Sequence, residues 1–335
     1  MYAIESGGIL PRTVVIGGGT GLSTMLRGLK YVMNDITAIV SVADDGGGSG
    51  VLRQELGMPP PGDVRNCIQA LARVEPTMEA LLAYRFQEGS LKGQSFGNLF
   101  LAALNGMSPS FDMAVSSMCE VLNIVGRVLP VTNDDVRLVA TFDDGSEVIG
   151  ESRIGHVKKG TSLHIHNIRL LPEKPKTLRA CLEAVRAADL IVLGPGSLYT
   201  SVIPNLLTDG LSEAILESDA VRVYVCNVMT EDGETQGYTV SDHLRALFEH
   251  GGGKLADCCL ANNKTFTAEI AARYGMEGAE PVRLDPEAVG ELGVRLHLAP
   301  IAGERDGFAR HDSIALAEAL LRLYHEESPA GRYEE

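Results

Sequence analysis

The residues with the clearest chemical potential stand in glycine-rich stretches that follow short apolar runs. The first stretch is Gly17-Gly18-Gly19-Thr20-Gly21, which comes after the apolar run Thr13–Ile16 and before a helical pattern. Glycines let a backbone approach a ligand closely, and the following helix offers free N–H groups to a phosphate. The spacing matches neither G-x-G-x-x-G, since Leu22 replaces the last glycine, nor a Walker loop. The stretch therefore predicts a phosphate or ribose contact, with packing of the glycines as the alternative.

A second stretch carries two adjacent carboxylates, Asp44 and Asp45, followed by Gly46-Gly47-Gly48-Ser49-Gly50. Its glycine content indicates a loop rather than regular structure. The carboxylates could accept ribose hydroxyls, bind Mg²⁺ or act as a base, and they are the candidate catalytic residues if the chain is an enzyme. The alternative is a turn in which both aspartates accept from local N–H groups. Arg53, shortly downstream, is either a phosphate partner or a solvated helix residue.

Two further blocks place small polar side chains at the start of helical patterns. Asp63 and Asn66 lie within one helical turn after a proline run, and Ser95 and Asn98 open the apolar helix that begins with Phe96. N–H groups at such positions can face a ligand together with these side chains. Asp63 and Ser95 could equally serve as helix caps alone. We expect both blocks to contribute to a ligand site.

A third glycine-rich loop, Gly194-Pro195-Gly196-Ser197, follows the apolar strand Leu190–Leu193, and Asn227 stands at the end of the next strand, Val221–Val228. Ligands of open α/β sheets sit beyond the carboxyl ends of the strands, so these polar loops predict a cleft at one edge. No G-x-S-x-G elbow or H-E-x-x-H helix supplies a nucleophile or a zinc site. The six cysteines form no C-x-x-C pair, which favours buried thiols over zinc or disulfides.

Apolar strand patterns alternate with helical ones along the whole chain. This order predicts an α/β fold: a doubly wound, mostly parallel, Rossmann-like sheet in a single domain spanning residues 1–335. Between about 125 and 172 the pattern changes to hairpin-like strands, including Glu147–Glu151, which indicates a small β-rich insertion. Downstream, we expect a helix over Asp242–Glu249 capped by Ser241, and a short strand near Val282.

Composition restricts the partners. The formal charge of −15 at pH 7, with no run of lysines or arginines, argues against binding nucleic acid. No window approaches the roughly 20 apolar residues of a membrane span, and residues 1–12 contain no apolar leader, so we expect a cytoplasmic protein. A homodimer is expected from the frequency of twofold symmetry among soluble oligomers.

Five blocks in chain order resemble the gluconeogenesis factor (YvcK-like) family, and the resemblance runs from about residue 12 to 325. At Gly48 this chain departs from the family loop, which has serine there, so a hydroxyl is lost. The blocks are Val15-Ile16-Gly17-Gly18-Gly19-Thr20-Gly21-Leu22-Ser23, Val42-Ala43-Asp44-Asp45-Gly46-Gly47, Pro60-Pro61-Gly62-Asp63-Val64-Arg65-Asn66, Ser95-Phe96-Gly97-Asn98 and Gly194-Pro195-Gly196-Ser197-Leu198-Tyr199-Thr200-Ser201.

The resemblance implies a regulator of carbon metabolism and of cell shape and envelope growth that binds a UDP-sugar and acts through a partner protein. It places sugar-nucleotide contacts on Tyr274 and Arg310; a core tyrosine and a surface arginine are the alternatives. The wider superfamily includes the phospholactate transferases (CofD), which use a guanosine nucleotide and magnesium. Their Gly-Trp-Gly signature is absent, since this chain has no tryptophan. A transferase using a nucleoside diphosphate-linked donor with Mg²⁺ is therefore the second hypothesis.

Overall fold

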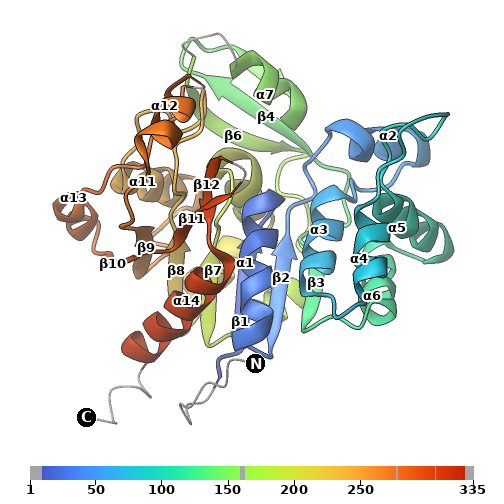
Figure 1. Ribbon diagram of the computed structural model, residues 1–335, viewed down its shortest axis with the longest axis horizontal. Coiled ribbons are helices and arrows are strands. Elements are labelled where there is room, and N and C mark those ends of the chain that lie inside the picture. The colour runs from blue at the N-terminus through green and yellow to red at the C-terminus, as the bar shows by residue number, and fades with distance from the viewer. Residues whose placement is uncertain (1–9, 159–162, 277, 306, 329–335) are drawn as a thin grey trace.

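The computed structural model describes residues 10–158, 163–276, 278–305 and 307–328 (Figure 1). A seven-stranded sheet with the order β10-β9-β8-β7-β1-β2-β3 lies at its centre, and every pair of neighbouring strands is parallel. The strands are β1 (Thr13–Gly17), β2 (Ile36–Val40), β3 (Arg127–Pro130), β7 (Leu190–Leu193), β8 (Val221–Val225), β9 (Cys258–Asn262) and β10 (Arg295–Ala299).

The strand order confirms the predicted doubly wound, Rossmann-like fold. The chain builds outward from β1 through β2 to β3, then returns to the other side of β1 with β7 and continues to β10. The direction of winding therefore reverses between β1 and β7. This reversal opens a crevice at the carboxyl ends of these two strands, which is where ligands bind in such sheets. All residues of β1, β2 and β7 are buried, as expected for strands covered on both faces.

Helices cover the sheet, and α1 and α14 lie together in front of it in the view of Figure 1. Gly28 of α1 permits this close packing, since a Cβ there would lie 1.7 Å from the carbonyl oxygen of Ser313. The helices are α1 (Gly19–Val32), α2 (Gly47–Leu56), α3 (Gly62–Leu71), α4 (Pro76–Ala83), α5 (Phe96–Met107), α6 (Phe111–Val121), α7 (Glu151–Lys158), α8 (Arg179–Ala187), α9 (Ile203–Leu206), α10 (Leu211–Leu216), α11 (Val240–Gly251), α12 (Ala268–Met276), α13 (Pro286–Glu291) and α14 (Ser313–Glu327), with a π-helical turn at Leu198–Val202.

A small antiparallel sheet with the order β5-β4-β6 and helix α7 lies beyond the carboxyl ends of the main strands, at the top of Figure 1. Its strands are β4 (Arg137–Phe142), β5 (Glu147–Ile149) and β6 (Ile165–Leu171). The range predicted for the insertion, about 125–172, also contains β3, which pairs with β2 in the main sheet. Strands β11 (Ala302–Arg305) and β12 (Phe308–His311) form a separate hairpin before α14.

Three local predictions are wrong. Gly47–Gly50 is not a loop but the first turn of α2, where Gly50 passes so close to Asp45 that a Cβ would lie 2.1 Å from the Asp45 carbonyl oxygen. Helix α11 is capped by Thr239, whose side chain and that of Asp242 satisfy each other's backbone N–H groups, and not by Ser241. The strand expected near Val282 is reduced to isolated bridges at Pro281 and Arg283, because each pairs at a single position.

Within the described residues, no helix has the length and apolar character needed to cross a membrane.

Candidate functional site

The loops that follow β1 and β7 touch each other at the reversal point of the sheet. A Cβ on Gly21 would lie 2.7 Å from the Pro195 carbonyl oxygen and 2.9 Å from Gly196 Cα. Asn227, at the end of β8, braces the second loop: its side-chain amide accepts from the Gly196 N–H at 3.3 Å and donates to the Gly196 carbonyl at 2.8 Å. Packing therefore accounts for Gly21, and Asn227 holds the loop in place.

Asp63 links the first glycine-rich loop to α3. Its Oδ2 accepts the Gly19 N–H at 2.7 Å, and a Cβ on Gly18 would lie 2.8 Å from the same oxygen. The N-cap position of α3 is occupied by Pro61, so Asp63 is not the cap that one alternative envisaged. It stands in the first turn of α3, with half-buried Asn66 three residues further on. The missing side chain at Gly18 is thus what lets the carboxylate reach the loop.

Three carboxylates, those of Asp44, Asp63 and Glu151, lie near one another above this loop. Burial raises the pKa of Asp63 to about 7, with the charge of Asp44 adding to the effect. Burial likewise raises the pKa of Glu151 to about 7, and among the acidic groups that add to this shift Asp44 contributes most. The pKa of Asp44 is also raised by burial, although its Oδ1 accepts the Gly46 N–H at 2.8 Å. Three acidic side chains are therefore crowded into a partly desolvated cleft that disfavours their charged forms.

Asp45 faces the insertion. Its Oδ1 accepts the N–H of Ser152 at 2.8 Å, at the start of α7, and a Cβ on Gly150 would lie 2.5 Å from its Oδ2. A carboxylate at a helix N-terminus is favoured by the free N–H groups and by the helix dipole. The alternative of acceptance from local N–H groups therefore fits Asp44, which accepts from Gly46 two residues on, but not Asp45, whose donor Ser152 is distant in the chain. Asp44 is also the member of the pair that belongs to the acidic cleft.

Arg53 is buried rather than solvated, with 8% of its side chain exposed. Its Nη2 donates to the carboxylate of Asp135 and, at 2.6 Å, to the carbonyl of Val136. These bonds tie α2 to the segment that leads into β4. The solvated-helix alternative is wrong for this residue, because the guanidinium lies beneath the insertion.

Ser95 and Asn98 both have structural partners. The Ser95 hydroxyl accepts the Asn98 N–H at 3.2 Å and so caps α5, as the cap alternative held. The Asn98 side chain, 3% exposed, accepts from Arg65 Nε at 3.1 Å. Burial lowers the pKa of Arg65. The hydrogen bond between Arg65 and Asn98 therefore holds α3 against α5, next to the cleft.

Tyr274 and Arg310, far apart in the sequence from the glycine-rich loop, line one cavity with it. The cavity has a volume of about 300 Å³ and is also lined by Thr20, Gly21 and Asn227. Tyr274 donates its hydroxyl to the Ala309 carbonyl at 3.0 Å. The exposed guanidinium of Arg310 lies 5.7 Å from the centre of the Phe308 ring. The N-terminal turn of α1 thus lines the same cavity as the cationic side chain of Arg310.

A second cavity of about 270 Å³ shares Asn227 and Val228 with the first. It lies at the carboxyl ends of β8 and β9 and contains polar side chains and one aromatic ring, from Asn262, Asn263, Lys264 and Phe266. Two adjacent cavities of this kind suit an elongated ligand with chemically different ends.

Sequence reasoning missed three polar residues at the site: Glu151, Glu234 and His311. Glu234 is 1% exposed and accepts from the Ser197 hydroxyl, which in turn accepts from Thr200 at 2.8 Å. His311 lines the first cavity, and burial lowers its pKa to about 4, so that it is neutral at pH 7. The sequence did hold a signal for Glu234, because it is an acidic residue that follows a strand. Glu151 was missed because it was predicted to end a strand, whereas it begins α7.

Fold and site together define a class: a Rossmann-like α/β protein whose cleft at the reversal point joins a helix N-terminus, an arginine and a group of carboxylates. The comparisons identify the family within that class. Residues 13–302 match the family of 2-phospho-L-lactate transferase CofD. A relative from Thermoanaerobacterium thermosulfurigenes is 53% identical over 313 residues, covering 93% of this chain and 97% of the relative. This chain belongs to the CofD family, as one of its gluconeogenesis factor-like members.

Two further relatives support this assignment. The gluconeogenesis factor of Bacillus subtilis is 45% identical over 317 residues, covering 94% of this chain and 99% of that protein. A crystal structure of a protein from Bacillus halodurans superposes with a TM-score of 0.90 at 48% identity, covering 93% of this chain and all of that one. The resemblance noted in the sequence is thus confirmed, as is the fold class.

Proposed function

We propose that this protein binds a nucleotide sugar of the UDP type and acts as a regulator of carbon metabolism and of cell shape and envelope growth. One observation carries the proposal: Tyr274 and Arg310 line the same cavity as Thr20 and Gly21 at the start of α1. Helix N-termini and guanidinium groups are the two protein features that best receive phosphate oxygens. The diphosphate therefore occupies this cavity.

The second cavity, next to the first, suits the nucleoside end of the same ligand. Phe266 offers a face on which a base can stack, and the amide of Asn263 can both donate and accept hydrogen bonds at the base edge. The Asn262 amide already bonds in both directions with the Lys264 backbone. Asn227 stands at the junction of the two cavities. Because its amide already braces Gly196, ligand binding there would act directly on the loop that follows β7.

In this proposal the ligand is sensed rather than consumed, and the signal passes to a partner protein in the cytoplasm. Ser197, the serine of the loop that follows β7, donates to Glu234 rather than to a histidine, so it does not form a serine–histidine pair. We further propose that the protein works as a homodimer, as most symmetric oligomers do.

Titration calorimetry with UDP-sugars, GDP and GTP, each with and without Mg²⁺, tests the proposal. We expect a UDP-sugar to bind and Arg310→Ala to weaken it without unfolding the protein. Arg273→Ala is the matched control, because Arg273 also lies against Phe308, at 5.3 Å from the ring centre, but does not line the cavity. Equal affinities in wild type and Arg310→Ala would remove Arg310 from the site, and no binding by any nucleotide would refute the proposal.

The second candidate function is a transferase that uses a nucleoside diphosphate-linked donor with Mg²⁺. The observation that favours it is the group of carboxylates from Asp44, Asp63 and Glu151, since carboxylate oxygens suit Mg²⁺ and a cation would offset their mutual repulsion. In such a reaction Mg²⁺ would neutralise charge on the diphosphate, and Asp44 would help to hold it. Consumption of a nucleotide during the binding experiment, abolished in Asp44→Asn, would favour this function over the sensor.

A further inference from the structure

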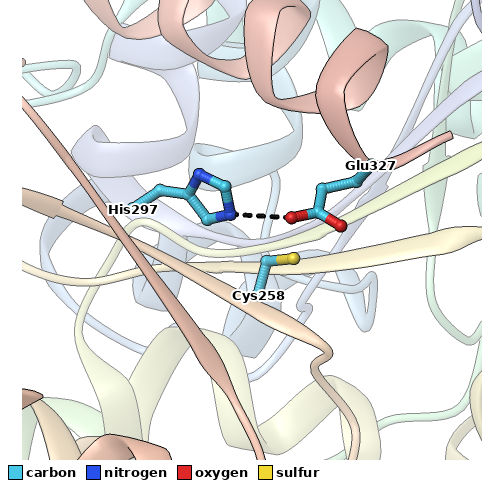
Figure 2. Close-up of side chains that lie close together, drawn as sticks. All are labelled: Cys258, His297 and Glu327. Atoms are coloured by element: carbon cyan, nitrogen blue, oxygen red, sulfur yellow. Dashed lines mark hydrogen bonds and ion pairs between the residues drawn. The ribbon is translucent and has the colours of Figure 1, made fainter. Parts of the chain in front are cut away.

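A cysteine, a histidine and a glutamate converge at the edge of the main sheet, away from the cleft. Cys258 begins β9, and the parallel register pairs it with Arg295 on β10, the edge strand. His297 lies two residues beyond Arg295 and so projects from the same face of the sheet. Glu327, the last residue of α14, covers this face, and Figure 2 shows the three side chains pointing toward one another.

The donor atoms are closely spaced. One ligand atom from each of Cys258, His297 and Glu327 lies within 4.8 Å of the other two, and His297 Nε2 is 3.0 Å from Glu327 Oε1. In a tetrahedral zinc site with bonds of about 2.0–2.1 Å, a nitrogen and an oxygen ligand stand about 3.3 Å apart. The observed spacing therefore needs only small side-chain movements to accept a metal ion.

We propose that Cys258 Sγ, His297 Nε2 and a Glu327 carboxylate oxygen form a Zn²⁺ site with water as the fourth ligand. Thiolate, imidazole and carboxylate are all established zinc donors, and this mixed set disfavours the harder ions Mg²⁺ and Ca²⁺. Binding converts the Cys258 thiol to a thiolate, and its proton passes to solvent.

Two charged residues next to the three ligands, Glu326 and Arg295, support this site. Glu326 Oε2 lies 3.6 Å from His297 Nδ1, the nitrogen that does not face the cluster, so its charge can favour the ring orientation that turns Nε2 toward the metal. Arg295 donates from Nε to Glu327 Oε1 at 2.9 Å and lies 3.6 Å from Cys258 Sγ. The guanidinium thus fixes the carboxylate and can stabilise the thiolate that zinc requires.

The site fastens the end of α14 to the edge strand β10. It stands at the amino end of β9, whereas the second cavity lies at the carboxyl end of that strand. We therefore assign it a structural role, independent of nucleotide-sugar binding. The competing interpretation is a metal-free cluster in which Arg295 and His297 simply satisfy the buried carboxylate of Glu327.

The test uses the full-length chain, stripped of metal with a chelator and titrated with Zn²⁺ and with Co²⁺. We expect one Zn²⁺ per chain by elemental analysis, a higher melting temperature with Zn²⁺, and a thiolate-to-cobalt charge-transfer band with Co²⁺. Cys258→Ser should remove that band and weaken Zn²⁺ binding by roughly tenfold or more, and Glu326→Gln should weaken it by roughly tenfold. Cys119 lies outside the cluster, so Cys119→Ser should change neither the charge-transfer band nor the affinity for Zn²⁺.

If Cys258→Ser does not fold, His297→Gln on the partly exposed edge strand provides the same test. The proposal is overturned if the wild-type chain takes up no Zn²⁺. It is equally overturned if Cys258→Ser and His297→Gln bind Zn²⁺ as tightly as the wild type does.

Discussion

The backbone N–H of Gly19 donates to Asp63 Oδ2 over 2.7 Å, and this bond fastens the start of α1 to the start of α3. It occupies one of the free N–H groups at the α1 N-terminus, while Thr20 and Gly21 border the cavity that Arg310 also lines. It also holds the Asp63 carboxyl beside Asp44, in a region of low solvent access. The same residue thus anchors the loop and contributes to the acidic cleft.

Asp63→Asn should change how stability depends on pH. Because the pKa of Asp63 is raised to about 7, the folded chain keeps a proton that the unfolded chain releases from about pH 4 upward. Wild-type stability should therefore fall as the pH rises from about 4 to 7, and the asparagine variant should lose this component. Its side-chain oxygen can still accept from Gly19. The free energy of unfolding in urea, measured at pH 5 and pH 8, checks the difference, which should be on the order of 3 kcal/mol.

Asp219→Asn serves as the control for that experiment, since Asp219 is exposed and precedes β8, at the end of the strand opposite the cleft. It should reproduce the wild-type pH profile. If Asp63→Asn also follows the wild-type profile, the carboxyl is not held protonated near neutral pH, and the account of the acidic cleft is wrong.

Gly21→Ala should separate the two glycine-rich loops. The new methyl group would lie 2.7 Å from the Pro195 carbonyl oxygen and 2.9 Å from Gly196 Cα. Both are backbone atoms, so one of the two loops must shift. We expect a loss of about 1–3 kcal/mol in the free energy of unfolding, together with weaker UDP-sugar binding. Chemical denaturation measures the first effect and calorimetry the second.

The matched control is Gly106→Ala in α5, where a Cβ would meet no atom within 4 Å. There alanine should raise stability by up to about 1 kcal/mol, because it favours the helix more than glycine does. A Gly21→Ala variant as stable as Gly106→Ala would mean that the loops are not packed as described.

Much of this architecture follows from local signals in the sequence, whereas the site depends on distant contacts. Buried strands such as Thr13–Gly17 are mostly apolar, and glycine-rich loops mark where they end, so the sheet and its polar edge were predictable. Glu151 was not, because it joins the cleft only when the insertion folds back and Asp45 accepts from Ser152. The first turn of α2 was predicted as a loop because its residues are mostly glycine, and glycine is unfavourable in helices.

Tyr274 and Arg310 are a second example of site residues that are brought together by contacts between distant parts of the chain. Nothing local relates them to Gly21, and the family resemblance alone placed them together in advance. The structure brings them to one cavity because β12 leads into α14, which packs on α1, while α12 carries Tyr274 to the Ala309 carbonyl. These residues meet through tertiary packing, whereas the periodicity of a single sequence predicts only local helices and strands.

Arg53→Met should impair folding rather than ligand binding. The substitution keeps much of the apolar volume but leaves the Val136 carbonyl without its donor and Asp135 without its partner. We expect a loss of about 1–3 kcal/mol in the free energy of unfolding. UDP-sugar affinity, measured by calorimetry below the unfolding transition, should stay near that of the wild type. A large loss of affinity in a fully folded variant would instead restore Arg53 as a phosphate partner.

Gly48→Ser should be tolerated better than Gly48→Ala, although it adds the larger side chain. A Cβ at this position would lie 2.8 Å from Gln94 Oε1, a buried oxygen that has no hydrogen-bond partner in the described structure. Either substitution must displace the end of the glutamine side chain, but only serine brings a hydroxyl that can donate to it. We expect the serine variant to be more stable than the alanine variant by about 1 kcal/mol in chemical denaturation. On a Gln94→Ala background the two variants should become equal, and an alanine variant at least as stable as serine on the native background would contradict this pairing.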